Sequence, residues 1–146
     1  MNSERIRTLA KALDDTIEAG DAERLTSFFS QDCEVRLPGV TLHGSDGLRK
    51  AVGWMFANLK DISLVPVAIT VQDNIFMEEF VLRARAAGGE VDVRQAEVLE
   101  YDADYRVKSL RLYFDRLELA PVLASGFIDR ILIRQVSKAS LKGLLP

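Results

Sequence analysis

The chain has 146 residues, 48% of them hydrophobic and 28% charged, so it can bury a core and is predicted to form one domain. The net charge is −3; residues 120–146 carry +3 and the remainder −6, and an acidic body argues against nucleic acid as a partner. The sequence holds one cysteine, Cys33, one histidine, His43, no long apolar run and no signal-peptide core. We therefore expect a cytoplasmic protein without a disulfide, a zinc site or a membrane span.

Apolar residues recur at helical spacing in three N-terminal segments. The first is predicted to start at an N-cap, Ser3, and to end at Gly20, and Asp21 is predicted to cap a short second helix. Ser45 is predicted to cap a third helix that runs through Leu59. The apolar stripe of the first helix consists of Ile6, Leu9, Ala10, Leu13 and Ile17.

Alternation of apolar and polar residues predicts five strands, at residues 33–37, 62–71, 75–86, 91–101 and 106–119. Pro38-Gly39 ends the first, and Ala103 and its flanking aspartates form a turn before the last. Helices that cover one side of a mostly antiparallel sheet make an α+β domain. We predict a curved, cone-shaped antiparallel sheet packed on the N-terminal helices, with a pocket at its wide end.

The C-terminal segment, residues 122–145, is predicted to form one amphipathic helix after Pro121. It combines an apolar stripe with basic residues at i+4 spacing. We favour docking of the stripe on the domain or on a dimer partner, and an anionic membrane surface is the alternative. The stripe is Ile128, Ile131, Leu132, Val136 and Ala139, and the basic residues are Arg130, Arg134, Lys138 and Lys142.

Glu97 is the anomaly of the fourth predicted strand. It shares a face with Val91, Val93, Leu99 and Tyr101, and burial of a carboxyl is costly unless the group is paired or used. Desolvation would raise its pKa, so that it could donate a proton. The alternative is a rim glutamate bonded to water or Gln95. Glu78 is expected on the same face one strand away, either beside Glu97 or at the solvated end of its strand.

Four motifs in this order resemble the nuclear-transport-factor-2-like superfamily, in its SnoaL-like and ketosteroid isomerase-like branch. They are EAGD at residues 18–21, FFSQDCEV at 28–35, LHGSDGLR at 42–49 and RVKSLRLYFD at 106–115. The resemblance implies a SnoaL-like domain over residues 1–119, with residues 120–146 as its helical extension. It also implies a small-molecule pocket and a homodimer, and we expect the dimer to form through the sheet face that carries Arg83, Arg94, Arg111, Tyr113 and Asp115.

The resemblance also allows a position-by-position comparison of catalytic residues. Where ketosteroid isomerases have a base and a tyrosine donor, this chain has Leu37 and Leu13, and only the protonated-acid position keeps a carboxyl, as Glu97. The water-activating aspartate of limonene epoxide hydrolases matches Leu112. Asp115 is the acid nearest the aspartate of SnoaL-type cyclases, but alternation places it on the opposite face from Leu112.

Two functional hypotheses follow. The first is binding of a small, largely apolar molecule, with or without acid/base turnover of the isomerase, cyclase or hydrolase kind at Glu97. The second is a non-catalytic dimeric ligand-binding or protein-interaction module. Neither needs a cofactor or a metal. We interpret His43 as a helix-entry residue and Cys33 as a core residue, while Trp54 and Tyr101 pack or line the pocket. The predicted pocket residues are Leu13, Val35, Leu37, Glu78, Phe80, Leu82, Gln95, Glu97, Leu110, Leu112 and Phe114.

Overall fold

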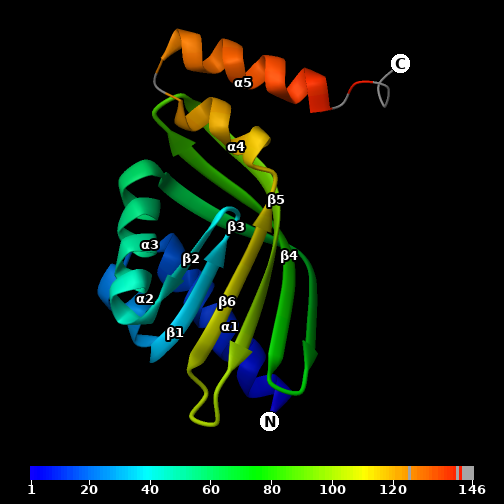
Figure 1. Cartoon of the computed structure of the whole chain (residues 1–146). Coiled ribbons are helices and arrows are strands. Elements are labelled where there is room, and N and C mark those ends of the chain that lie inside the picture. Colours follow the sequence, from blue (N-terminus) through cyan, green and yellow to red (C-terminus); the bar gives the residue numbers. More distant parts are fainter. Residues whose placement is uncertain (125, 141, 143–146) are drawn as a thin grey trace.

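The computed structural model describes residues 1–124, 126–140 and 142, and Figure 1 shows the arrangement of its elements. The helices are α1 (Ser3–Glu18), α2 (Ala22–Ser27), α3 (Gly44–Asn58), α4 (Arg116–Leu123) and α5 (Phe127–Ser140). The strands are β1 (Phe29–Leu37), β2 (Val40–His43), β3 (Lys60–Gln72), β4 (Ile75–Ala86), β5 (Gly89–Tyr101) and β6 (Val107–Phe114). Among the described residues, no helix is long and apolar enough to cross a bilayer.

The six strands form one curved sheet in the order β2-β1-β6-β5-β4-β3. All neighbouring pairs are antiparallel except β1 and β6, which run parallel, so the sheet is mostly antiparallel, as expected. Helices α1 and α3 cover the concave face of the sheet (Figure 1). The predicted α+β cone is therefore the observed architecture.

The helix starts differ from the prediction in two places. Asn2, not Ser3, caps α1, because its side chain accepts a hydrogen bond from the backbone N–H of Arg5. His43, not Ser45, is the residue before α3, and its side chain makes no capping bond. Asp21 caps α2 as expected, accepting from the N–H of Arg24.

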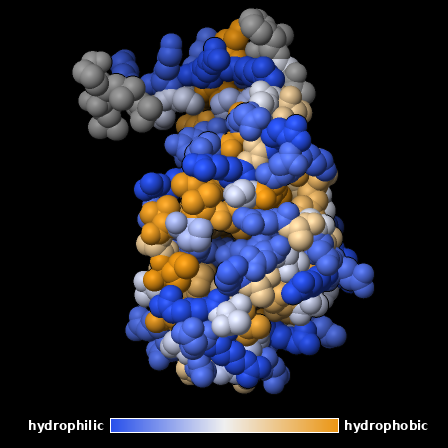
Figure 2. Space-filling model, turned by 180° about the vertical axis from the view of Figure 1, so that it is seen from behind, coloured by the Kyte–Doolittle hydropathy of each residue, from blue (hydrophilic) through white to orange (hydrophobic). Residues whose placement is uncertain are grey.

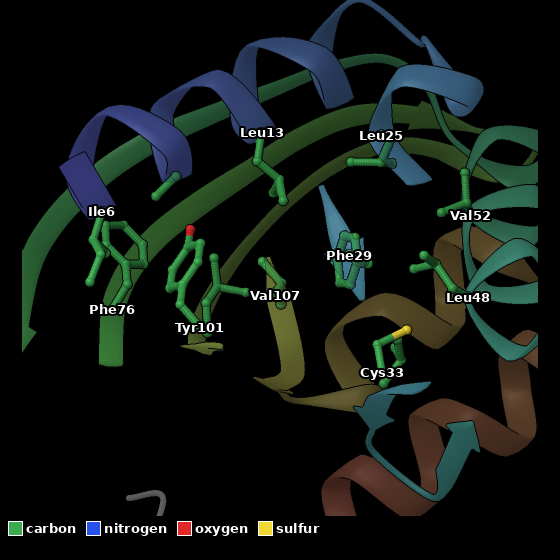
Figure 3. Packing of buried hydrophobic residues seen from close by; sticks show 13 residues of the cluster. Ile6, Leu13, Leu25, Phe29, Cys33, Leu48, Val52, Phe76, Tyr101 and Val107 are labelled. Carbon is green, nitrogen blue, oxygen red and sulfur yellow. The ribbon is translucent and has the colours of Figure 1, made fainter. Parts of the chain in front are cut away.

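Two hydrophobic clusters fill the cone. The first, at its narrow end, gathers side chains from α1, α2, α3 and the sheet, including Ile6, Leu13, Phe76 and Tyr101 (Figure 3). The second joins Phe80 and Leu82 to Val93 and Leu119. Because Leu119 is buried and belongs to α4, the predicted boundary at residue 119 falls inside a helix that packs on the core.

The C-terminal segment departs most from the sequence-based expectation. The last strand ends at Phe114, not Leu119, because Asp115 caps α4 by accepting a hydrogen bond from the N–H of Leu117. Pro121 lies inside α4, and the amphipathic helix begins at Phe127. It packs chiefly on α4. Residues 125, 141 and 143–145 of the predicted helix, and the side chain of Ile128, lie outside the described part of the chain.

The apolar stripe of α5 is not buried by its own chain. Ile131, Leu132 and Val136 are all exposed, so docking of the stripe on the same domain is wrong for these residues. Docking on a second copy or on a membrane surface stays a prediction. Apolar side chains also reach the surface along one edge of Figure 2, the edge formed by β3, where Val67 and Ile69 are exposed.

Candidate functional site

A cavity of about 150 Å³ lies inside the cone, between the concave face of the sheet and helices α1 and α3. An engineered apolar cavity of about this volume accepts a molecule as large as benzene. Its walls are aliphatic and aromatic, and the two polar side chains that reach it, Gln95 and Glu97, both come from β5. The predicted residues that line it are Leu13, Val35, Leu37, Phe80, Leu82, Gln95, Glu97, Leu110, Leu112 and Phe114.

Strand register explains why these residues converge. On β5, Glu97 pairs with Glu78 of β4 on one side and with Leu112 of β6 on the other. Directly paired residues of antiparallel strands share a face, so all three side chains point inward. Glu78 is buried but does not line the cavity, so the structure places it beside the predicted pocket and not in its wall.

Glu97 is buried in apolar surroundings without its full set of hydrogen bonds. Its side chain is 6% exposed, and its Oε1 has no hydrogen-bond partner among the described residues. Desolvation, followed by the charges of Asp14 and Glu78, raises the pKa of Glu97 to about 8. At neutral pH the carboxyl is therefore mostly protonated and can donate a hydrogen bond into the cavity.

Asp14 of α1 completes a group of three acids that sequence reasoning missed. One carboxylate oxygen each of Asp14, Glu78 and Glu97 lies within 4.8 Å of the others. Burial, and then the charge of Glu78, raises the pKa of Asp14 to about 7. Burial also raises the pKa of Glu78. Three negative charges this close cannot all persist in an apolar setting, so protons are shared within the group.

The helical pattern contained a signal for Asp14. It follows Ala10 by four residues and precedes Ile17 by three, so it borders the apolar stripe of α1 that packs on the sheet. Its neighbour Asp15 does face solvent, where it pairs with Lys11. From the sequence alone, Asp14 and Asp15 both look like solvent-exposed residues of a charged helix surface. Only the position of Glu97 in the folded chain shows that Asp14 lies against another acid.

Tyr101 belongs to the narrow-end cluster and does not line the cavity. Its ring is 2% exposed, and its hydroxyl points toward α1 in Figure 3. That hydroxyl has no hydrogen-bond partner among the described residues. Burial, and then the charges of Glu97 and Asp14, raise its pKa well above the ordinary tyrosine value. It remains a neutral hydroxyl behind the three acids.

The three carboxylates also have the spacing that could hold a cation, which the sequence does not predict. Carboxylate oxygens suit hard divalent ions such as Mg²⁺ or Ca²⁺. Protons compete for the same oxygens, because the pKa values of Asp14 and Glu97 are raised to about 7 and about 8. At neutral pH, bound protons can therefore neutralise most of the charge of the three acids without a cation.

His43 and Cys33 lie outside the cavity wall. His43 Nδ1 is 3.8 Å from an oxygen of Glu34, its partner on β1, but His43 is exposed and Glu34 is partly exposed. Cys33 is buried in the narrow-end cluster, and burial raises the pKa of its thiol. Trp54 does line the cavity, from α3, while 47% of it stays exposed.

A wider groove of about 610 Å³ adjoins the cavity at the open end of the cone. Its walls come from the β1–β2 hairpin, α3, α4 and the start of α5. Five side chains line both spaces, so the two spaces are adjacent, and we call the wider one the entrance groove. The five shared side chains are Leu37, Ala51, Trp54, Phe114 and Leu119.

The sequence matches the SnoaL-like domain family over residues 10–109, so the chain belongs to this family. No match was found among curated proteins. Solved structures share the fold at low sequence identity, which makes them evidence for architecture rather than chemistry.

Three of these structures illustrate the range. An NTF2-like protein of unknown function from Burkholderia pseudomallei is 13% identical over 86% of this chain and all of its own, with a TM-score of 0.76. A protein from Shewanella denitrificans, described as a SnoaL-like polyketide cyclase, is 10% identical over 83% of this chain and 98% of its own, with a TM-score of 0.72. SalBIII is an epoxide hydrolase/cyclase-like enzyme with a role in pyran ring formation in the polyether salinomycin. It is 8% identical to this chain over 80% of this chain and 95% of its own, with a TM-score of 0.72.

Proposed function

We propose that this protein binds a small, largely apolar molecule that carries an oxygen acceptor, and that neutral Glu97 donates a hydrogen bond to that oxygen. The observation that carries the proposal is the buried, unpartnered Oε1 of Glu97 at the wall of an apolar cavity. A buried polar group without a partner costs about 1–3 kcal/mol, and a ligand oxygen would offset that cost. Gln95, the other polar side chain of the wall, would orient the same ligand.

Acid assistance is the chemistry this arrangement favours. Protonation of a carbonyl or epoxide oxygen by Glu97 would promote isomerisation, ring closure or hydrolysis at the adjacent carbon. The proton would be replaced through Asp14, which is partly exposed and lies beside Glu97. Leucines stand at the family's base and second-donor positions, Leu37 and Leu13, so we expect slow acid assistance and no rapid proton shuttle.

The solved relatives give this proposal its reaction class. The SalBIII enzyme acts in pyran ring formation, and the Shewanella protein is described as a polyketide cyclase. Both descriptions concern ring closure. We carry over only that class, because identities of 8% and 10% do not transfer residue roles.

The test is ligand binding by three variants at about pH 6, with cyclohexanone as the probe and methylcyclohexane as its apolar counterpart. The two ligands differ in hydrophobicity, so the measured quantity is the ratio of their affinities in each variant relative to wild type. Glu97→Gln keeps a donor and should leave that ratio unchanged, while Glu97→Leu should shift it toward methylcyclohexane and be as stable as wild type or more so without ligand. Glu78→Gln is the matched control, because Glu78 is equally buried but does not line the cavity.

The competing hypothesis is a non-catalytic module, favoured by the leucines at the family's catalytic positions and by the small inner cavity. Ligand pockets for drug-sized molecules start at roughly 300 Å³, and the cavity reaches that size only together with its entrance groove. If Glu97→Leu binds cyclohexanone as tightly as wild type does, Glu97 has no role in binding and this second hypothesis stands. The homodimer and the cytoplasmic location stay predictions under either hypothesis.

A further inference from the structure

The entrance groove differs in character from the cavity behind it. Its floor and walls are apolar, but three charged side chains, Lys50, Arg116 and Asp129, stand along it. Lys50 and Arg116 are exposed, and neither forms an ion pair within the described residues. The entrance therefore presents two cations and one acid, on a chain whose net charge is −3.

Arg116 is seated against the β1–β2 turn. Its Nη1 lies 2.7 Å from the point where a side-chain carbon would be at Gly39, so the guanidinium occupies space that only glycine leaves free. Gly39 also has a φ of +87°, a backbone conformation that favours glycine. Arg116, the first residue of α4, thus places a planar cationic fork beside the groove and against the turn.

The interior is unsuited to a charged group. The cavity wall is aliphatic and aromatic apart from Gln95 and Glu97, so a carboxylate buried there would lose its hydration with little compensation. The same carboxylate at the entrance keeps contact with water and lies beside two cations. On β6, Leu112 lies beside Glu97; the strand ends two residues later at Phe114, and Arg116 is the first residue of α4, so β6 connects the inner end of the site to the entrance.

We propose that the site takes a single-chain amphipathic carboxylate, with its carboxylate at Arg116 and Lys50 and its apolar chain running through the groove into the cavity. This inference rests on the proposed function of the inner cavity and adds the ligand class and its orientation. Trp54, which lines both spaces, would pack against the chain where it passes from groove to cavity. A carbonyl or ether oxygen near the far end of the chain would meet Glu97.

The test compares decanoate with decanol, which share a chain and differ in head-group charge. Each exposed charge contact contributes up to about 1 kcal/mol, so two of them predict a three- to tenfold tighter dissociation constant for decanoate at low salt. Added salt should shrink the preference. Lys50→Gln with Arg116→Gln should bring the ratio of decanoate affinity to decanol affinity close to one. The control is Arg7→Gln, which removes one exposed charge on α1 and should keep the preference.

The outcomes separate this inference from the proposed function. If wild type binds both ligands equally, or if the double variant keeps the preference, the carboxylate inference is overturned even when decanol and cyclohexanone bind. If neither chain binds while cyclohexanone does, the groove is not part of the ligand site and the inference again fails. If cyclohexanone also fails to bind, the proposed function itself is wrong. Tight decanoate binding that depends on Arg116 and Lys50 supports the inference.

Discussion

Glu97 shows how burial at one position determines the chemistry of a whole site. Glu97 is paired with a second acid, Glu78, on the neighbouring strand β4, and Asp14 of α1 lies close to both. Desolvation then dominates and holds the carboxyl neutral at pH 7, with a pKa of about 8. The same shift makes a prediction about stability, because the folded chain binds this proton more tightly than the unfolded chain does.

The direction of the pH dependence of stability follows from the raised pKa of Glu97. The stability that the Glu97 proton contributes is complete below about pH 4.5, the ordinary glutamate value, and is lost as pH rises through about 8. We expect the free energy of unfolding to fall across this window by on the order of 4 kcal/mol from Glu97, with a further fall as Asp14 ionises near pH 7. Urea denaturation of wild type and Glu97→Gln at several pH values measures the difference.

The control for that series is Glu90→Gln, on the exposed end of the same strand. It should follow the wild-type pH profile, while Glu97→Gln should show a much flatter one. Equal profiles for wild type and Glu97→Gln would mean that Glu97 is ionised in the folded protein across the whole range, contrary to the neutral-acid account.

Tyr101 offers a second test at the scale of one residue. Its hydroxyl is buried without a partner among the described residues, which costs about 1–3 kcal/mol. Tyr101→Phe should therefore leave the free energy of unfolding unchanged or raise it by about 1 kcal/mol. Tyr113→Phe, at an exposed tyrosine, is the control and should stay within about 0.5 kcal/mol. A loss of more than 1 kcal/mol in Tyr101→Phe would reveal a hydrogen bond at the hydroxyl.

Among single residues, the sequence indicated that Glu97 and Glu78 share a sheet face, but not that Asp14 lies against them. A carboxyl on an apolar strand face stands out because strand alternation assigns faces within a few residues. Asp14 did not stand out, because its environment depends on which strand the helix covers, and that is a long-range property. The same reason explains Asp115, expected on the outer sheet face: it caps α4 instead, after the strand has ended.

Among the elements, the sequence did not predict α4, because its first residues alternate between apolar and polar as a strand does. Leu110, Leu112 and Phe114 alternate as a strand should, and Leu117 and Leu119 also alternate with polar residues but in the opposite phase. The interruption is Asp115, whose carboxylate accepts from the N–H of Leu117 and starts a helix. Short helices leave few turns in which helical spacing can be recognised.

Helix α4 is anchored at the turn between β4 and β5, which yields a prediction. Gly88 donates a backbone hydrogen bond of 2.8 Å to the carbonyl oxygen of Val122, and a Cβ at Gly88 would overlap that carbonyl group. Gly88→Ala should therefore displace α4 and cost about 1–3 kcal/mol, measured by urea denaturation. Gly53→Ala in α3 is the matched control, because open space surrounds Gly53 and alanine should stabilise the helix by up to about 1 kcal/mol.

Stability of Gly88→Ala equal to that of wild type would show that α4 is not held at this turn. Since Leu119 and Arg116 of α4 line the entrance groove, the same variant should also weaken decanoate binding.

For the whole molecule, the sequence predicted the cone and its cavity but not the strand order. Family motifs and segregated helices imply a curved sheet, and the cavity residues follow from which faces are apolar. The parallel pairing of β1 with β6 and the hairpin strand β2 were not predicted. Residues 40–43 are too few to show an alternation, and pairing between distant strands leaves no local trace.

The outer face of the sheet supports the prediction of a homodimer. Met77 and Tyr113 are about half exposed there, around a nearly buried Val98. Nearby, Arg111 has a buried Nε with no partner among the described residues. Two other arginines of the predicted face are satisfied within the chain, because Arg83 pairs with Asp92 and Arg94 with Glu79.

We expect wild type to sediment as a dimer at about tens of micromolar. Met77→Glu with Tyr113→Glu should sediment as a monomer, because it places charges in the apolar centre of the interface. Val67→Glu, at the exposed edge strand β3, should remain dimeric. A monomeric wild type would refute the predicted interface.

The neutral acid facing the cavity is tested most directly by a ¹³C NMR titration of the Glu97 carboxyl, with and without cyclohexanone. The account predicts a midpoint at about pH 8 in the free protein, because desolvation and the two neighbouring acids disfavour the charged form. Cyclohexanone should move the midpoint higher, because it accepts a hydrogen bond only from the protonated acid. A midpoint near the ordinary glutamate value of about 4.3, unmoved by cyclohexanone, would contradict the account.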